Sequence, residues 1–379
     1  MSGENQFDVI IIGGGIGGLS LSIQSALAGF KTAVFEKEKY PFHKVCGEYI
    51  SNESRGYLLD CGIAVDDPAL PKIRLLTISD IHGQCFDFPL DTGGFGISRY
   101  RIDNALFEAA KKSGVEVFSG RKVNGISFEN DTFSISANDA VYYSKTAVAA
   151  SGKRSNIDLK MKRKFAMQKL PKDRNYLGIK YHLHYDLRPE RIELHNFSNG
   201  YCGISKIEDN KCCLCYLTTA ENLSNNNNSI KEMEENVLFE NPRLRSIFSR
   251  AEFLFNEPVA ISQISFEKRS QVEQHVLMIG DAAGLISPLC GNGMSMAMQS
   301  GKIAFQNIRM FLNGQISRQT MEENYARQWQ KTFGRRMFVG RNIQKLFGNN
   351  YTTSQFLKLM QAVPSLSNYL IRQTHGRAF

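Results

Sequence analysis

The stretch from Phe7 to Glu36 constrains the fold more than any other part of the chain. An apolar, β-branched run at residues 7–12 predicts a buried strand, and the glycine-rich segment 13–18 follows it directly. Apolar residues then recur at helical spacing as far as Leu27, and a second apolar run ends at Glu36. The order of strand, glycine-rich turn, helix, strand and acid predicts a dinucleotide-binding βαβ unit.

Three glycines of this turn have different predicted roles. Gly13 permits the tight turn out of the strand, Gly15 lets the backbone approach a pyrophosphate, and Gly18 lets the helix pack close to the strands. The free N–H groups at the helix N-terminus favour phosphate binding. Glu36 follows Gly18 by eighteen residues, where a carboxylate can accept hydrogen bonds from both ribose hydroxyls of adenosine. The alternative is a glycine-rich turn without a ligand.

Length and composition indicate a large globular chain. It has 379 residues, of which 42% are hydrophobic and 22% are charged, so two or three domains with a sizeable core are expected. No apolar run approaches the roughly 18 residues that suggest a membrane-spanning helix, and the early strand argues against a signal peptide. Eight cysteines without regular spacing favour reduced thiols over a disulfide framework. We therefore expect a cytoplasmic protein.

The net charge of +9 is concentrated near the C-terminus. Residues 302–379 contain 12 Lys and Arg against two acids, a net charge of +10, so residues 1–301 sum to about −1. One basic group is interleaved with apolar residues, at Arg335, Arg336, Arg341 and Lys345. A helix with this pattern could lie peripherally on an anionic inner membrane surface; the alternative is that its apolar side packs on the fold and the cations face water. Nucleic acid is not expected, because no binding motif accompanies the charge.

Two kinds of periodicity divide the chain. From Tyr176 to about Ser265 apolar residues alternate with period two, which predicts antiparallel strands with one covered face and one open face. Alternating strand and helix patterns occupy most of the remainder, and the C-terminal region is helical. The predicted fold is α/β, with a discontinuous Rossmann-type domain (1–70, 98–160 and 267–310), an antiparallel β-sheet substrate domain (71–97 and 161–266) and a helical C-terminal region (311–379).

Two motifs late in the first domain favour a flavin over NAD. Gly280 and Asp281 follow a predicted buried strand, where a carboxylate can accept a hydrogen bond from a ribityl hydroxyl, which NAD lacks. The segment Pro288–Gly293, with glycines at Gly291 and Gly293, precedes a long predicted helix. Its N–H groups could hold the negative edge of a reduced flavin. FAD is therefore the predicted cofactor.

At these positions the sequence resembles the flavoprotein monooxygenase superfamily with the p-hydroxybenzoate hydroxylase fold, and within it the geranylgeranyl reductase family. The likeness covers most of residues 5–310. The motifs that carry it are Gly13–Gly18 with Glu36, Lys44-Val-Cys46-Gly47-Glu48, Arg99 four residues before Asp103, and Gly280–Gly293. The resemblance implies that Arg99 lies near the FAD pyrophosphate. It also implies that the Lys44–Glu48 segment, including Cys46 and Gly47, and the Pro288–Gly293 loop lie beside the isoalloxazine.

The sequence departs from the family pattern in two places. Ser151-Gly152 stands where the superfamily usually has Asp-Gly, which weakens a pyrophosphate or nicotinamide role at this position. Gly200–Ser205 stands where the reductases and the related flavin halogenases usually have a strand containing Trp, and the single Trp of this chain is Trp329. The second departure argues against halogenation and lowers support for reduction of a prenyl chain.

Cysteines and histidines supply the candidate catalytic groups. A Cys46 thiol near the flavin, with its pKa lowered by Lys44, is one hypothesis; a small buried residue beside a turn at Gly47 is the alternative. Cys212 and Cys215 form a Cys-x-x-Cys within an apolar run, which indicates strand packing, and no metal site is predicted. Three histidines on predicted strands could act as a base toward a phenol, but ordinary sheet polarity is the preferred interpretation, at His182, His184 and His195.

The sequence thus predicts an FAD-dependent oxidoreductase that acts on an apolar small molecule. The preferred reaction is monooxygenation, with hydroxylation of an aromatic or polyketide-like substrate. The alternative is geranylgeranyl reductase-like reduction of isoprenoid double bonds, and a minor alternative is a non-catalytic flavin-binding protein. No second GxGxxG is present, so NAD(P)H is expected to act as a transient electron donor. Substrate identity, NADH versus NADPH and the oligomeric state are left open.

Overall fold

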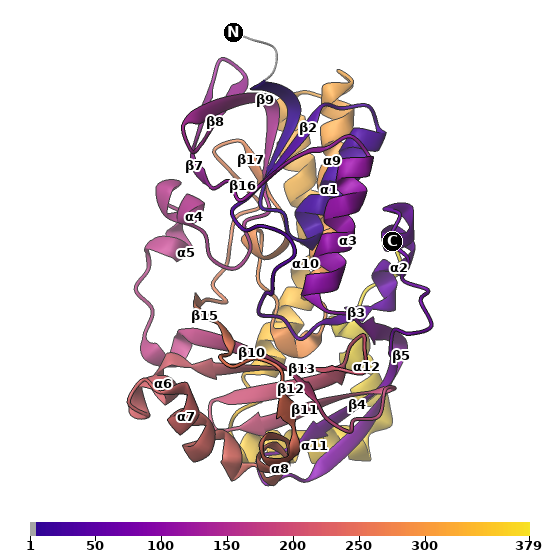
Figure 1. Ribbon diagram of the computed structural model, residues 1–379, viewed down its shortest axis with the longest axis vertical. Coiled ribbons are helices and arrows are strands. Elements are labelled where there is room, and N and C mark those ends of the chain that lie inside the picture. The colour runs from indigo at the N-terminus through magenta and orange to yellow at the C-terminus, as the bar shows by residue number, and fades with distance from the viewer. Residues whose placement is uncertain (1–4) are drawn as a thin grey trace.

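The computed structural model describes residues 5–379 and contains two sheets at opposite ends of the molecule (Figure 1). The first sheet has the strand order β16-β17-β9-β1-β2-β6, and β7 and β8 extend it beside β9. Its central strands β17, β9, β1, β2 and β6 run parallel. Its strands are β1 (Gln6–Ile12), β2 (Thr32–Glu36), β6 (Glu116–Ser119), β7 (Val123–Glu129), β8 (Thr132–Ala137), β9 (Ala140–Ala149), β16 (Val272–Glu273) and β17 (Val276–Met278).

Three helices cover this parallel sheet: α1 (Ile16–Leu27), α3 (Arg99–Lys112) and α9 (Gly293–Leu312). Helix α1 connects the parallel strands β1 and β2, as the predicted βαβ unit requires. The β1 residues Val9, Ile10 and Ile11 are completely buried, because β1 lies between β9 and β2 in the sheet and α1 packs against it. The Rossmann-type fold predicted from the sequence is therefore confirmed.

The second sheet has the order β14-β10-β13-β12-β11-β4-β5-β3, and β15 pairs with β10. All of its described pairings are antiparallel except β4 with β11. Its strands are β3 (Tyr49–Ser51), β4 (Lys72–Ser79), β5 (Cys85–Gly96), β10 (Tyr176–His184), β11 (Arg191–Phe197), β12 (Gly200–Lys206), β13 (Cys212–Thr219), β14 (Glu252–Phe253) and β15 (Val259–Ile264). The domain boundaries stay a prediction, and strand β3 pairs in this second sheet although residues 1–70 are assigned above to the first domain.

The remaining helices lie around and between the two sheets (Figure 1). The α-helices are α2 (Arg55–Asp60), α4 (Asn156–Lys160), α5 (Lys164–Met167), α6 (Ala220–Asn225), α7 (Ile230–Asn236), α8 (Pro242–Arg250), α10 (Arg318–Gln344), α11 (Asn350–Ala362) and α12 (Pro364–Thr374). The 3-10 segments are η2 (Asn52–Ser54), η3 (Lys172–Arg174), η4 (Leu238–Glu240), η5 (Gly280–Ala282) and η6 (Pro288–Cys290). No helix within residues 5–379 is both long and apolar enough to cross a membrane.

The expectation that one face of the second sheet is open is wrong. On the outer face, Tyr181, Leu183 and Tyr216 form a core with Met233 of α7 and Ile247 of α8. On the inner face, an apolar cluster joins the sheet to α11 and α12. The period-two pattern did not indicate this closure, because alternation along a strand does not specify which helices pack against its two faces.

The basic C-terminal segment is only partly exposed. Trp329, Phe333 and Met337 of α10 are buried in the core of the first domain, and Arg336 Nη1 lies 3.5 Å from Glu53 Oε1 in a buried ion pair. Phe338 is 64% exposed, so some of the interleaved apolar residues face outward. Peripheral membrane contact stays a prediction. Arg336 could not contribute to it, because its guanidinium is paired with Glu53.

A buried carboxyl group in the outer core gives a pH-dependent prediction. Glu234 of α7 accepts hydrogen bonds from Tyr181 Oη at 3.0 Å and Tyr216 Oη at 2.6 Å. Burial raises the pKa of Glu234 to about 7, although both hydroxyls oppose the shift. Because the folded protein then holds the proton more tightly than the unfolded chain, the stability from this group is complete below pH 4.5 and decreases as the pH rises toward 7.

We expect Glu234→Gln to remove a pH-dependent contribution of up to about 3 kcal/mol between pH 5 and pH 8. Urea unfolding of both proteins at the two pH values measures it. Glu235→Gln, at the exposed neighbouring position, is the matched control and should unfold like the wild type at both pH values. Equal pH dependence of Glu234→Gln and wild type would contradict the assignment.

Candidate functional site

The glycine-rich turn joins β1 to α1 at the carboxyl end of the parallel sheet. Gly13 has φ +107°, and a Cβ there would lie 2.4 Å from the carbonyl oxygen of Ala150. A Cβ at Gly18 would lie 2.2 Å from the carbonyl oxygen of Gly13. Both positions need glycine for the fold itself, because a side chain would collide with backbone atoms.

Gly15 is different, because the space in front of it is open. A Cβ at this position would meet no backbone atom within 4 Å, and its nearest neighbours would be Arg99 Nη2 and Lys44 Nζ, each at 3.6 Å. Gly15 also precedes the first residue of α1, where helix N–H groups lack intrahelical partners. The backbone and two cations thus border a space that suits a pyrophosphate.

A buried carboxylate borders this space at the end of β2. Glu36, the last residue of β2, accepts hydrogen bonds from the N–H groups of Gly14 at 3.0 Å and Glu38 at 3.1 Å. These bonds hold the glycine-rich turn against the end of β2. Glu36 therefore lies beside the glycine-rich turn.

Arg99 and Lys44 are held by one acid. Arg99, at the start of α3, binds Asp103 through Nε at 2.8 Å and Nη2 at 2.6 Å, and Lys44 Nζ lies 3.3 Å from Asp103 Oδ2. Burial alone would raise the pKa of Asp103, but Arg99 and Lys44 outweigh it and hold that pKa below its ordinary value. Asp103 therefore remains charged and fixes the two cations beside Gly15.

The motifs after β17 approach the same region from the other side. The N–H of Gly280 donates to Ser300 Oγ of α9 at 2.9 Å. The half-buried carboxylate of Asp281 accepts no hydrogen bond from a described residue, although its backbone oxygen accepts one from Arg269 Nη1. Gly291 has φ +63°, and Gly293 opens α9.

Several polar groups around these loops are suited to the predicted cofactor. Ser151 Oγ, just after β9, and Asn292 Oδ1, between the two loop glycines, are buried and have no hydrogen-bond partner among the described residues. Together with the open space at Gly15 and the unpaired Asp281, these groups are suited to a ligand rich in hydroxyl, amide and phosphate groups. The residues present therefore fit FAD.

We expect Asp281→Ala to weaken FAD binding by about 10-fold to 150-fold, because a charge-assisted hydrogen bond to a ribityl hydroxyl contributes ~1.5–3 kcal/mol. Flavin fluorescence during titration of the apoprotein measures the change. Glu257→Ala removes an exposed acid of the second domain and is the matched control. Unchanged FAD affinity in Asp281→Ala would exclude this contact.

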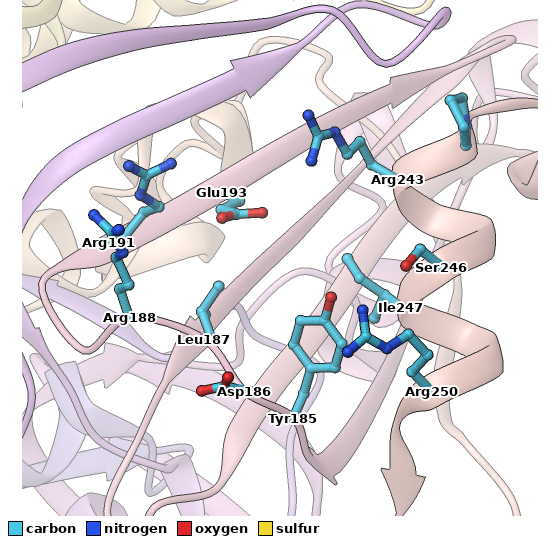
Figure 2. Close-up of a pocket in the computed structure, with 11 residues that line it drawn as sticks. Tyr185, Asp186, Leu187, Arg188, Arg191, Glu193, Arg243, Ser246, Ile247 and Arg250 are labelled. Atoms are coloured by element: carbon cyan, nitrogen blue, oxygen red, sulfur yellow. The ribbon is translucent and has the colours of Figure 1, made fainter.

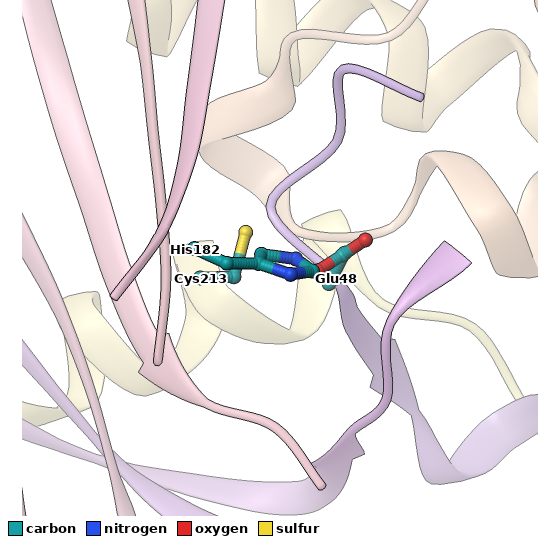
Figure 3. Close-up of side chains that lie close together, drawn as sticks. All are labelled: Glu48, His182 and Cys213. Carbon is teal, nitrogen blue, oxygen red and sulfur yellow. The ribbon is translucent and has the colours of Figure 1, made fainter. Parts of the chain in front are cut away.

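The Lys44–Glu48 segment carries a buried ionic cluster that sequence reasoning did not select (Figure 3). Glu48 is fully buried and bonds Lys180 Nζ at 2.5 Å, His182 Nε2 at 2.6 Å and the backbone N–H of Arg99 at 2.7 Å. Burial alone would raise the pKa of Glu48, but the bonds from His182 and Lys180 hold it below its ordinary value. This carboxylate joins β10 of the second sheet to the segment before β3 and to α3 of the first domain.

Glu48, His182 and Cys213 lie close enough to ligate a metal ion, but their other contacts argue against one (Figure 3). Both oxygens of Glu48 already accept hydrogen bonds, and Cys213 Sγ donates to the carbonyl of Cys46 at 3.2 Å. Burial also raises the pKa of the Cys213 thiol well above its ordinary value, which disfavours the thiolate that a metal needs. The cluster is better described as an ion pair with a histidine.

The structure alters the expectations for the cysteines. Lys44 Nζ is engaged with Asp103 and lies 3.8 Å from Glu36 Oε2, so its charge is already shared by two carboxylates. Within the Lys44–Glu48 segment, Glu48 has a left-handed backbone conformation, with φ 55°. Cys46 is half-buried, and catalytic roles for Cys46 and Lys44 stay predictions.

The other sequence candidates lie on strands of the second sheet. Cys212 packs in the outer core, and Cys215, three residues further along β13, points to the opposite face because side chains alternate. One metal ion could not bind both sulfur atoms. His195 is bonded to Ser79 Oγ at 2.9 Å and Glu193 at 3.0 Å, as ordinary sheet polarity predicts.

An apolar cavity of about 90 Å³ adjoins the Pro288–Gly291 part of the loop. It lies between the inner face of the second sheet and the C-terminal helices, and it can hold several water-sized groups, each needing about 10–15 Å³. Its wall is almost entirely hydrophobic and includes Leu76, Ile78, Leu90, Leu194, Leu289, Ile343, Phe347, Phe356, Met360, Leu370 and Ile371. Tyr49, Thr374 and His375 are its polar members, and the buried hydroxyl of Tyr49 lacks a hydrogen-bond partner among described residues.

Neither Tyr49 nor the Glu48–Lys180 pair was predicted as functional. The pair joins positions far apart in sequence, and Tyr49 reaches the cavity only because β3 pairs with the second sheet. One sequence signal was available: Lys180 is a lone cation in the otherwise apolar centre of a strand, where a charge requires a buried partner.

Comparisons with known proteins support the flavin assignment. The FAD binding domain family model matches residues 8–43, which span β1, the glycine-rich turn, α1 and β2. Conditioned medium factor receptor 1 of Dictyostelium discoideum is 24% identical over 360 residues, covering 87% of this chain and 69% of that protein.

Two solved structures share the whole fold. A flavin-dependent brominase superposes with a TM-score of 0.82 at 20% identity, over 99% of this chain and 94% of that one. A geranylgeranyl bacteriochlorophyll reductase-like protein of Thermoplasma acidophilum superposes with a TM-score of 0.77 at 18% identity, over 99% and 97% of the two chains. The chain therefore has the fold of FAD-dependent enzymes and carries an FAD-binding domain.

Proposed function

We propose that this chain is an FAD-dependent oxidoreductase acting on an apolar small molecule. The observation that carries the proposal is the open space in front of Gly15, bordered by Arg99 and Lys44, which suits a pyrophosphate. The apolar cavity beside the Pro288–Gly291 loop supports an apolar substrate, and its volume of about 90 Å³ would receive only part of it. When bound, FAD supplies the redox chemistry. The chain's own residues hold and orient it: the turn at Gly15 with Arg99 and Lys44 receives the pyrophosphate, and Asp281 receives a ribityl hydroxyl. The hydrophobic wall excludes water from the substrate.

Monooxygenation of an aromatic or polyketide-like substrate is the reaction we prefer. Tyr49 supports it, because its hydroxyl is buried in a hydrophobic wall without a partner. A phenolic hydroxyl of the substrate would satisfy Tyr49, whereas a plain hydrocarbon would leave it unpaired at a cost of about 1–3 kcal/mol. Tyr49 would thus orient the ring without taking part in the chemistry.

Reduction of an isoprenoid double bond is the second candidate. Most of the cavity wall offers hydrophobic contacts, which suit an isoprenoid chain. The structural likeness to the Thermoplasma geranylgeranyl bacteriochlorophyll reductase-like protein is consistent with a reductase reaction. NAD(P)H is the proposed transient electron donor in both cases.

One experiment separates the reactions. The purified FAD-loaded protein is reduced with NADH or NADPH, and oxygen consumption and products are measured with phenolic and prenyl substrates. Substrate-stimulated oxygen uptake with a hydroxylated product supports the monooxygenase. Anaerobic reoxidation of the reduced flavin by a prenyl substrate supports the reductase. A brominated product in the presence of bromide would contradict both.

A further inference from the structure

A second cavity, of about 580 Å³, lies between the β10–β11 connection, β11 and α8 (Figure 2). Leu187 and Ile247 contribute to its wall and also belong to the outer core of the second sheet. The opposite face of the same sheet carries Lys180 and His182, which bind Glu48. The sheet therefore separates this cavity from the candidate active site.

Four arginines surround the cavity from two sides (Figure 2). Arg188 and Arg191 come from the β10–β11 connection and the start of β11. Arg243 and Arg250 come from α8, and their spacing of seven residues, about two turns, puts them on one face of the helix. The described acids in the wall are Asp186 and Glu193, which is already bonded to His195. Positive charge is therefore in excess.

These guanidinium groups have unused donors. Within residues 5–379, the side chains of Arg188 and Arg250 make no hydrogen bond and no ion pair. Arg191 Nε is buried without a partner, and its Nη2 is 3.5 Å from the exposed Asp87. Arg243 Nε reaches only the carbonyl of Gly83, at 3.4 Å. Like charges around one cavity repel each other, and a polyanion would relieve that repulsion.

We propose that this arginine cavity (Arg188, Arg191, Arg243 and Arg250) binds a diphosphate group. The guanidinium fork matches two phosphate oxygens at once, and arginines on two sides of the cavity match two linked phosphate groups. The volume is in the usual range for small-molecule sites, about 300–1,000 Å³. Because the sheet separates the site from the flavin side, the ligand is neither the oxidised substrate nor the hydride donor.

Inorganic pyrophosphate is the probe for the first experiment. Isothermal titration of the FAD-loaded protein should give saturable binding at one site. Arg188→Ala/Arg250→Ala should weaken it by about tenfold or more, because each arginine offers charge-assisted hydrogen bonds. Arg245→Ala is the matched control: it lies on the same helix, donates to the carbonyl of Phe239 and does not line the cavity. It should leave the affinity unchanged.

Three results would overturn the proposal. The first is the absence of saturable pyrophosphate binding. The second is equal weakening of binding in the control variant. The third is that sulfate, titrated at the same ionic strength, binds as tightly as pyrophosphate. Circular dichroism verifies that the variants are folded. Arg250→Glu is a second variant that places a negative charge against the ligand, and it must weaken binding more than Arg250→Ala does if the site is correct.

Discussion

Replacing Gly15 by valine is expected to give a folded protein that purifies without flavin. The new side chain would enter the space between the glycine-rich turn, Arg99 and Lys44, where its Cβ meets no backbone atom within 4 Å. It would occupy the position proposed for the pyrophosphate and disrupt several charge-assisted contacts, each contributing about 1.5–3 kcal/mol. We therefore expect FAD affinity to fall by more than about 100-fold.

Flavin absorbance of the purified protein and circular dichroism measure the two parts of this prediction. Gly56→Val is the matched control, because its added Cβ has no neighbour closer than 4.0 Å and lies in α2, away from the turn. Gly18→Val should instead disrupt folding, because its Cβ would lie 2.2 Å from a backbone oxygen. A Gly15→Val protein that retains stoichiometric FAD would show that the pyrophosphate lies elsewhere.

Replacing Glu48 by glutamine is expected to lower the free energy of unfolding by about 3–5 kcal/mol. The variant leaves the Lys180 ammonium fully buried without a compensating charge. The amide could keep some of the hydrogen bonds that Glu48 makes with His182 and Arg99, so the predicted loss arises mainly from the unpaired cation. Guanidinium unfolding, followed by circular dichroism, measures it.

The double variant Glu48→Gln/Lys180→Met tests the cause. Because it removes the buried cation together with its partner, it should recover much of the lost stability. Asp91→Asn is the control, since its ion pair with Arg372 is exposed and surface pairs contribute about 0–1 kcal/mol. If the double variant is no more stable than Glu48→Gln, the electrostatic explanation is wrong.

The parts of the fold with strong local periodicity could be predicted from the sequence. The βαβ unit from Phe7 to Glu36 was predicted because buried strands, glycine positions and helix spacing all act within thirty residues. The alternation from Tyr176 to about Ser265 was likewise sufficient to predict antiparallel strands there, and β10, β11, β12 and β13 lie in that range. Short-range patterns report the face that each element buries, and that is sufficient to define the elements.

Periodic patterns could not predict which elements contact one another. Alternation in β10 and β13 could not indicate that α7 and α8 cover the outer face and that other segments cover the inner one. The pairing of Lys44 with Asp103 was likewise not indicated by the pattern. A residue's charge is visible in the sequence, but its partner depends on how distant parts of the chain fold together.

The sequence by itself determined the nucleotide-binding turn, because Gly13, Gly15, Gly18 and Glu36 satisfy requirements that are local to one strand, turn and helix. Only the tertiary structure decided that Gly15 faces open space while Gly13 and Gly18 contact backbone. It also decided where Glu48 finds Lys180 and where the four arginines of the second cavity meet. The physical reason is that backbone geometry is set by neighbours in the chain, whereas burial and charge pairing are set by neighbours in space.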